Sequence, residues 1–220
     1  MAVKCGADVC AYYVKSAFQP QFELDDALKM ARHLQVDMKV LEVDILSETL
    51  VTCNQADRCY HCKKIIFSVI EKAANKDGFT LLLDGTNASD DAGDRPGMRA
   101  LNEMCVRSPL RECGLTKSEI RELSQKSGLF TWNKPAYACL ATRISTGMEI
   151  TSKKLIITET AENYLFSLGF TDFRVRMIGE SAKIQISASQ IDKLIRNRDE
   201  IVVKLKQYYS EILLDLEARE

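Results

Sequence analysis

Apolar and polar positions follow two alternating periods in the first half of the chain. A β-prone run at Cys10–Lys15 precedes apolar residues at helical spacing over residues 23–34. Residues 39–43 have the composition of a strand, residues 62–74 the spacing of a helix, and residues 80–83 the composition of a buried strand. Strands that alternate with helices predict an α/β fold with a parallel sheet and crossover helices.

The pattern changes after Gly147, where we place a domain boundary. The order helix, strand, strand, helix, strand predicts a small antiparallel sheet with helices on one face. We therefore predict two domains, residues 1–147 and a smaller α+β domain of residues 148–220. The predicted elements of the second domain are, in order, residues 152–168, 172–177, 182–187, 189–209 and 212–216.

Composition and charge exclude several classes of protein. Lys and Arg (30) nearly balance Asp and Glu (31), so no overall field attracts nucleic acid or a membrane surface. No apolar run approaches the length of a membrane span. Residues 1–11 contain Lys4 and Asp8 and have no long apolar core, so they do not resemble a signal peptide. We predict a cytoplasmic protein, whose eight cysteines are buried, metal-binding or catalytic rather than disulfide-bonded.

A polar cluster follows the predicted strand at residues 80–83. Ligands of parallel sheets bind beyond the carboxyl ends of the strands, so the cluster predicts a site for a nucleotide or its magnesium. A turn with an Asx cap is the alternative. An arginine before Pro96 is held in a loop, where binding residues concentrate. The predicted nucleotide-binding residues are Asp84, Gly85, Thr86, Asn87, Asp90 and Arg95.

Three cysteines are candidates for chemistry. Cys139 lies between Lys134 and Arg143, and cationic neighbours favour the nucleophilic thiolate. A buried thiol without a chemical role is the alternative for this residue. Cys59 and Cys62 form a CxxC pair just before a predicted helix. They are either structural thiols or, together with Cys139, ligands of an iron–sulfur cluster with one open iron.

Two arginines project from one face of the strand predicted at residues 172–177. Arg174 and Arg176 suit the phosphate of a mononucleotide, and we predict that they form an anion-binding patch with Arg143. A solvated face of an edge strand is the alternative. Glu162 is either an acid on a helix surface or a metal ligand.

Seven segments, taken in order, resemble the LarE family of ATP-dependent sacrificial sulfur transferases, a branch of the PP-loop ATP pyrophosphatases. No single segment is decisive, but the ordered set is specific. The segments are RCYHCK (58–63), DGTNASD (84–90), RPGMRA (95–100), SPL (108–110), TKSEIR (116–121), TWNKPAYACLATR (131–143) and RVR (174–176).

The resemblance implies an enzyme that uses ATP and Mg²⁺ to insert sulfur into a pyridinium-3,5-dicarboxylic acid mononucleotide. The product belongs to the nickel-pincer cofactor of lactate racemase. By resemblance, Cys139 gives up its own sulfur and becomes dehydroalanine. The family also carries a glutamate where this chain has Gln185, in a metal site with the position of Glu162. Because an amide is a weaker ligand for a hard cation, we expect weak metal binding here.

The chain also departs from the family pattern in its first residues. The family's serine-glycine-glycine-x-aspartate-serine loop binds the ATP phosphates, yet no Gly-Gly pair occurs in these 220 residues. Residues 1–15 resemble the family's chain just after that loop, namely the end of its helix and then the second strand. We therefore expect a sheet without its usual first strand, no ATP turnover by the 220-residue chain, and a homo-oligomer that covers the open edge.

Two alternatives to the sulfur transferase stay open. One is a tRNA-thiolating PP-loop enzyme, which would need a basic surface that a net charge of −1 does not favour. The other is a truncated, non-catalytic subunit that binds the pyridinium mononucleotide without turnover.

Overall fold

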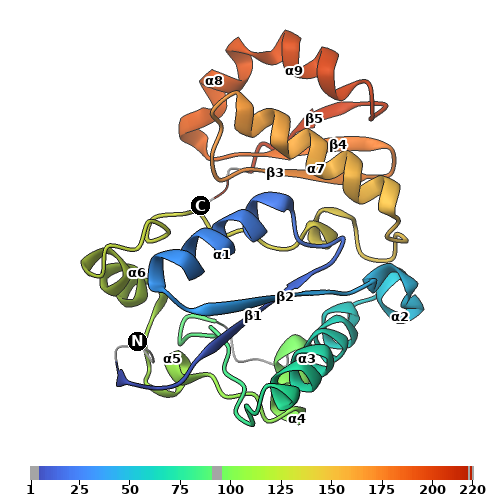
Figure 1. Cartoon of the computed structure of the whole chain (residues 1–220). Helices are drawn as coiled ribbons and strands as arrows, with labels where there is room; N and C mark the ends of the chain where they lie inside the picture. Colours follow the sequence, from blue (N-terminus) through green and yellow to red (C-terminus); the bar gives the residue numbers. More distant parts are fainter. Residues whose placement is uncertain (1–4, 91–95, 218, 220) are drawn as a thin grey trace.

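The chain folds into two lobes joined by a short seam (Figure 1). A computed structural model describes residues 5–90, 96–217 and 219. The N-terminal lobe contains the elements from β1 to η3, and the C-terminal lobe those from α7 to β5. Each lobe combines helices with a sheet, so the predicted α/β class is confirmed.

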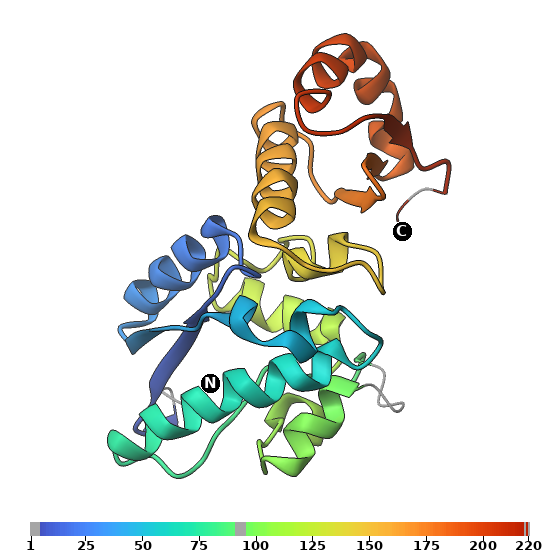
Figure 2. The same ribbon diagram turned by 90° about the vertical axis from the view of Figure 1, so that its right-hand side faces the viewer.

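A two-stranded parallel sheet lies at the centre of the N-terminal lobe. β1 (Cys10–Lys15) pairs with β2 (Asp37–Glu42) over their full lengths, from Cys10 opposite Asp37 to Lys15 opposite Glu42. Helix α1 (Gln21–Leu34) connects the two strands, as a parallel pair requires. Helix α3 (Arg58–Lys76) lies on the other side of β1, so the strand is sandwiched between two helices (Figure 2).

Residues 80–83 correct one prediction. They form no regular strand, and their only bridge joins Leu83 to Arg107. Leu81 is 59% exposed and Leu83 is 50% exposed, although their apolar composition predicted burial. A strand-like composition shows that the side chains are suited to burial. They become buried only where other segments of the chain pack against them on both sides.

Short helices complete the N-terminal lobe. Thr116 caps α6 with the capping box that the sequence predicted, because its side chain accepts from the backbone N–H of Glu119 while Glu119 bonds back to Thr116. The short elements are η2 (Ile45–Ser47), α2 (Thr49–Thr52), α4 (Pro96–Glu103), α5 (Pro109–Glu112), α6 (Lys117–Lys126) and η3 (Leu140–Arg143).

The C-terminal lobe contains a mixed three-stranded sheet in the order β3-β4-β5. β3 and β4 are antiparallel as predicted, but β5 runs parallel to β4, which corrects the expectation of a wholly antiparallel sheet. The single helix predicted at residues 189–209 is two helices that meet at Asn197. The elements are α7 (Ser152–Ser167), β3 (Arg174–Ile178), β4 (Ser181–Gln185), η4 (Ala188–Gln190), α8 (Ile191–Arg196), α9 (Arg198–Leu205) and β5 (Ile212–Leu214).

Buried apolar side chains gather in two clusters. One fills the C-terminal lobe, between α7, the sheet, α8 and α9. The other lies at the seam and joins Phe18 and Ile45 to Leu140, Ala141 and other residues on either side. The central sheet of the N-terminal lobe contributes only Val14 to the buried set, so the seam is better packed than the sheet beside it. The domain boundary near residue 147 stays a prediction, because the seam cluster spans it.

No helix in the described part of the chain is both long and apolar enough to cross a membrane.

Candidate functional site

The candidate nucleophile lies at the seam between the lobes. Cys139 precedes the one-turn helix η3, and its carbonyl accepts hydrogen bonds from the backbone N–H of Thr142 at 3.0 Å and from the Thr142 hydroxyl at 2.8 Å. The next residue, Leu140, is fully buried and donates its N–H to the carbonyl of Phe18 at 2.9 Å. The position of Cys139 is therefore fixed from both sides by buried structure.

Arg58 connects this segment to the first turn of α3. Its Nη1 donates to the carbonyl of Ala141 at 3.1 Å and to Oδ1 of Asn54, and its Nη2 lies 3.7 Å from Sγ of Cys59. The side chain of Arg58 is mostly buried, so these hydrogen bonds are shielded from water. One guanidinium thus joins the CxxC pair to the loop that carries Cys139.

The side chain of Asn54 forms hydrogen bonds with the same loop. It adopts a left-handed backbone conformation with φ of 54°, which asparagine tolerates better than most residues, and its side chain is inaccessible to solvent. Its Nδ2 donates to the carbonyls of Ser145 at 2.8 Å and Met148 at 3.0 Å. Asn54 therefore sets the path of the chain after η3.

The cations that surround Cys139 differ from those that the sequence predicted. Lys134 forms an ion pair with Asp26 and lies over the ring of Phe130. Burial raises the pKa of the Cys139 thiol above its usual range, and Arg58 is the cation that most opposes this rise, ahead of Arg143. The expectation of a thiol activated by Lys134 is therefore wrong, because the desolvation of the thiolate outweighs the nearby positive charge.

Three thiols interact in this region. The pKa of Cys62 is raised to about 12, mainly by burial and in smaller part by the neighbouring Cys139 and Cys59. Among residues 5–90, 96–217 and 219, however, no three His, Cys, Asp or Glu side chains are placed to hold a metal ion. The iron–sulfur cluster predicted for Cys59, Cys62 and Cys139 therefore stays a prediction; in this structure Cys59 is exposed, whereas Cys62 and Cys139 are partly buried.

We expect Cys62 to react slowly with iodoacetamide. Because the thiolate is the reactive form, a pKa near 12 lowers the rate at pH 8 by on the order of 10³-fold relative to an exposed thiol. Since unfolded thiols ionise near pH 8.5, the native state should also lose stability as the pH rises from about 8.5 towards 12. Mass-spectrometric timing of each cysteine tests the first point, with exposed Cys113 as the internal control. Equal rates at Cys62 and Cys113 would contradict the burial.

A buried ion pair joins the segment that follows Cys139 to helix α7 of the C-terminal lobe. Arg143 and Glu162 are each 1% exposed, and Nε of Arg143 donates to Oε1 of Glu162 at 2.7 Å. Glu162 also accepts from the hydroxyl of Tyr137 and from the backbone N–H of Val175. Glu162 is therefore not a surface acid: arginine, tyrosine and backbone donors contact both its oxygens, and its role as a metal ligand stays a prediction.

Arg174 and Arg176 lie beside this pair on β3. Arg174 is only 5% exposed and donates to the carbonyls of Phe173 and Ala136, so the alternative of a solvated edge is wrong. Arg176 donates to the carbonyl of Thr142 at 2.9 Å and to Gln185, which in turn donates to Asp215. The pKa of Arg174 is lowered to about 10, mainly by burial and in smaller part by the positive charge of Arg143. The three predicted arginines therefore gather in one place, where Glu162 pairs with Arg143 and Asp172 lies 4.0 Å from Arg174.

A polar cavity of about 510 Å³ lies between the N-terminal end of α3 and the loop after residue 83. It brings together several of the residues predicted to bind nucleotide, and Cys59 and Lys63 line it as well. Asp84 and Asn87 support the walls: Asp84 accepts from the hydroxyl of Ser108 at 2.6 Å, and the N–H of Asn87 donates to Asp90 at 2.9 Å. Arg95 lies outside the described residues. The cavity is lined by Ala56, Cys59, Lys63, Gly85, Thr86, Asp90, Pro96, Gly97 and Met98.

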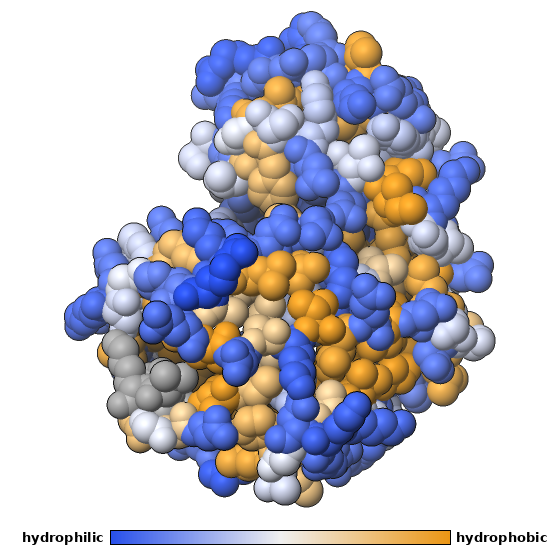
Figure 3. Space-filling model, viewed as in Figure 1, coloured by the Kyte–Doolittle hydropathy of each residue, from blue (hydrophilic) through white to orange (hydrophobic). Residues whose placement is uncertain are grey.

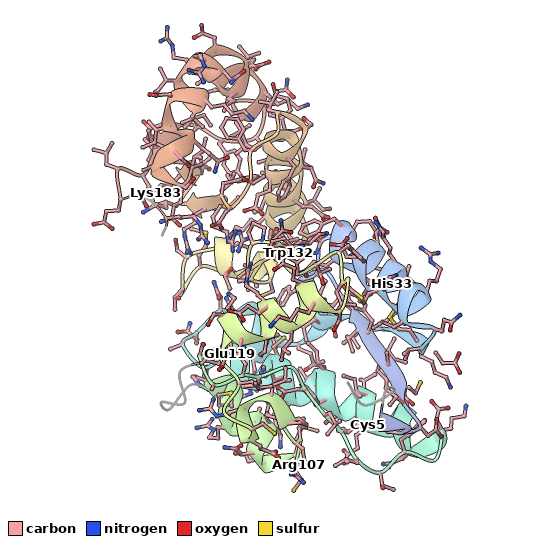
Figure 4. All side chains as sticks on the ribbon, turned by 90° about the vertical axis from the view of Figure 1, so that its left-hand side faces the viewer. Cys5, His33, Arg107, Glu119, Trp132 and Lys183 are labelled. Carbon is pink, nitrogen blue, oxygen red and sulfur yellow. The ribbon has the colours of Figure 1, made fainter. Side chains whose placement is uncertain are left out.

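The sequence did not indicate several residues of the site. Nothing in the pattern marks Asn54 as the residue that orders the loop, although an asparagine after a helix is a known candidate for left-handed backbone. Tyr137 lies under both Arg143 and Arg174, with ring-to-guanidinium distances of 4.5 and 5.2 Å. Trp132, which the family motif includes, lies near the junction of the lobes and is 37% exposed (Figure 4).

The fold and the site define an α/β protein with a cysteine held at the seam of two lobes, close to a polar cavity and an arginine cluster. No family model matches the chain. An uncharacterized protein of Synechocystis is 34% identical over 198 residues, which are 89% of this chain and 74% of that protein. An uncharacterized protein of Methanocaldococcus jannaschii is 29% identical over 93% of this chain and 79% of its own length.

Pyridinium-3,5-bisthiocarboxylic acid mononucleotide synthase of Lactiplantibacillus plantarum is 30% identical over 210 residues, which are 95% of this chain and 76% of the synthase. The chain therefore belongs to the family of this synthase, and the resemblance to the LarE family is confirmed.

Proposed function

We propose that the chain is a sulfur transferase that converts a carboxylate of a pyridinium dicarboxylic acid mononucleotide to a thiocarboxylate, with Cys139 as the sulfur donor. The observation that carries this proposal is the relationship to a synthase of the bisthiocarboxylic acid over 95% of the chain. The fixed position of Cys139 beside Arg58 supports it, because a donor that reacts once must be held in place before the substrate arrives.

The proposed reaction has two covalent steps. The Cys139 thiolate attacks an adenylated substrate carboxylate, so a thioester forms and AMP leaves with the electron pair of the broken C–O bond. A base then removes the Cα proton of residue 139, the Cβ–S bond breaks, and the sulfur leaves with the substrate as a thiocarboxylate. The side chain becomes dehydroalanine, so the protein loses the elements of hydrogen sulfide and no external oxidant or reductant is needed.

Activation of the carboxylate is proposed to use ATP and Mg²⁺. The polar cavity supports this assignment, since it gathers Gly85, Thr86 and Asp90, three of the residues predicted to bind nucleotide. Carboxylates such as Asp90 are the ligands that magnesium prefers, and Lys63 on the opposite wall supplies a cation for phosphate.

The arginine cluster is proposed to bind the phosphate of the mononucleotide. Replacing Arg174 with alanine should weaken binding of the pyridinium acid by about 2–5 kcal/mol. The guanidinium is largely desolvated, and without it the phosphate of the bound mononucleotide would lose a counter-charge. Titration calorimetry measures the change. Arg198→Ala is the matched control, since that arginine is exposed and, among the described residues, pairs with its neighbour Asp199 alone. Unaltered binding by Arg174→Ala would remove the cluster from the site.

The proposed function is tested with a chemically adenylated pyridinium acid, which separates sulfur transfer from ATP use. Without added sulfide, we expect thiocarboxylate to form in a single burst that stops at about one per chain, because each Cys139 holds one sulfur. Liquid chromatography with mass detection quantifies the product. Continued turnover far beyond the protein concentration, or no product at all, would contradict a sacrificial donor.

A further inference from the structure

One aromatic ring lies against two of the three clustered arginines. The guanidinium carbon of Arg143 is 4.5 Å from the ring centre of Tyr137, and the guanidinium carbon of Arg174 is 5.2 Å from it. Both distances are within the range in which the negative face of an aromatic ring attracts a cation. Tyr137 therefore contacts the arginine cluster through its ring as well as through its loop.

The two guanidiniums repel each other, and the carboxylates beside them differ in reach. Burial first, and then the positive charge of Arg143, lowers the pKa of Arg174. Glu162 pairs with Arg143 at 2.7 Å, whereas Asp172 lies farther from Arg174, at 4.0 Å. Hydrophilic residues cover most of the C-terminal lobe on the face that Figure 3 shows, yet Arg174 is only 5% exposed. An aromatic ring makes it less costly to hold two buried cations together, and it neutralises neither of them.

Tyr137 is itself held by both lobes. Its hydroxyl donates to Glu162 of α7, and burial together with that carboxylate raises the pKa of the phenol, so the hydroxyl keeps its proton. Phe22 of α1 packs edge-on against the ring, with 4.9 Å between the ring centres. The ring therefore has a fixed orientation before any ligand binds.

The segment that carries this ring also connects the arginines to the sulfur donor. Arg174 donates to the carbonyl of Ala136, and Arg176 donates to the carbonyl of Thr142. The two arginines of β3 thus bond to the chain on either side of Cys139. A shift of the guanidiniums relative to this segment would change the position of a bound phosphate relative to the thiol.

We propose that Tyr137 is a positioning residue for the phosphate of the mononucleotide, and that its ring holds Arg143 and Arg174 at a fixed spacing before the substrate arrives. This inference rests on the proposed role of the arginine cluster. Two guanidiniums that are already ordered bind a phosphate more tightly than two mobile ones, because less side-chain freedom is lost on binding. The site therefore selects a phosphate monoester, and the ring of Tyr137 should not affect the binding of the corresponding nucleoside.

The test compares the mononucleotide of pyridinium-3,5-dicarboxylic acid with the nucleoside that phosphatase treatment yields from it. Titration calorimetry measures the binding of both compounds to the unaltered chain and to Tyr137→Leu. We expect the variant to bind the mononucleotide on the order of 10-fold more weakly, since two cation–π contacts are lost, and to bind the nucleoside equally well. A purely structural role of Tyr137 would weaken the binding of both compounds by the same factor, and that result would overturn the proposal.

Matched variants separate the ring from the hydroxyl and from the packing around it. Tyr137→Phe keeps the ring and should bind the mononucleotide within about 2-fold of the unaltered chain. Phe22→Leu removes the neighbouring ring, which among the described residues has no cation over its face, and should have an equally small effect. A loss in either variant as large as that in Tyr137→Leu would overturn the role of the ring. If circular dichroism shows that Tyr137→Leu does not fold, Tyr137→Met, with a flexible side chain that fills the space, takes its place.

Binding also separates this inference from the function on which it rests, because it needs neither ATP nor sulfur transfer. If the unaltered chain bound the nucleoside as tightly as the mononucleotide, the arginine cluster would not bind the phosphate, and the proposed phosphate site would fail together with the inference. If the unaltered chain preferred the mononucleotide and Tyr137→Leu preferred it to the same extent, the inference alone would fail.

Discussion

Replacing Glu162 with alanine should destabilise the folded chain by about 3–5 kcal/mol, because it leaves a buried guanidinium without its counter-charge. Arg143 is 1% exposed and cannot reach water without opening the seam. The hydroxyl of Tyr137 and the N–H of Val175 would lose the same acceptor. Urea unfolding followed by circular dichroism measures the change, which is a large fraction of the stability of a typical domain.

Two further variants distinguish loss of the pair from loss of packing. Arg143→Met combined with Glu162→Leu removes both charges and should recover much of the stability, since apolar residues of similar size replace buried pairs well. Lys153→Ala, at an exposed residue in the first turn of α7, is the control and should change stability by less than about 0.5 kcal/mol. If Glu162→Ala were as mild as Lys153→Ala, the buried pair would not hold the lobes together.

Replacing Cys139 with alanine should abolish sulfur transfer completely while leaving the fold intact. The side chain is partly buried, so the loss of one sulfur atom costs about 1 kcal/mol or less of stability. The chemistry has no other donor at this position, because Cys62 is on helix α3 and Cys59 lines the polar cavity instead. The product assay with adenylated pyridinium acid measures the loss.

Cys113→Ala is the matched control for Cys139→Ala. Cys113 is exposed and ends the short helix α5, away from the seam, so its removal should leave the yield of thiocarboxylate unchanged. Thiocarboxylate formed by Cys139→Ala at the yield of the unaltered chain would show that the sulfur comes from elsewhere.

Elements that have a strong apolar–polar pattern, or clear capping residues at their ends, were predictable from the sequence. The bounds of β1 agree residue for residue, and the capping box at Thr116 was evident from its spacing, because both signals are local. Residues 80–83 were not predictable in the same way. Their composition suits a buried strand, but exposure of Leu81 and Leu83 depends on which segments lie beside them, and that is a non-local property.

The sequence predicted which residues form the site, but not which residues they contact. Cys139 was singled out by its motif, yet its controlling cation proved to be Arg58, whose Nη1 reaches Ala141, 83 residues later in the chain. Lys134 is nearer to Cys139 in the sequence, but its side chain forms an ion pair with Asp26. Sequence neighbours of a thiol do not fix its electrostatics, because the sign of the pKa shift depends on burial, which is set by tertiary packing.

The central claim is that the sulfur of Cys139 leaves with the substrate. The most direct measurement is the intact mass of the chain after reaction with adenylated pyridinium acid, together with peptide mapping. The account predicts a loss equal to hydrogen sulfide, with dehydroalanine at position 139 and at no other cysteine. Thiocarboxylate product alongside an unchanged Cys139 would contradict it.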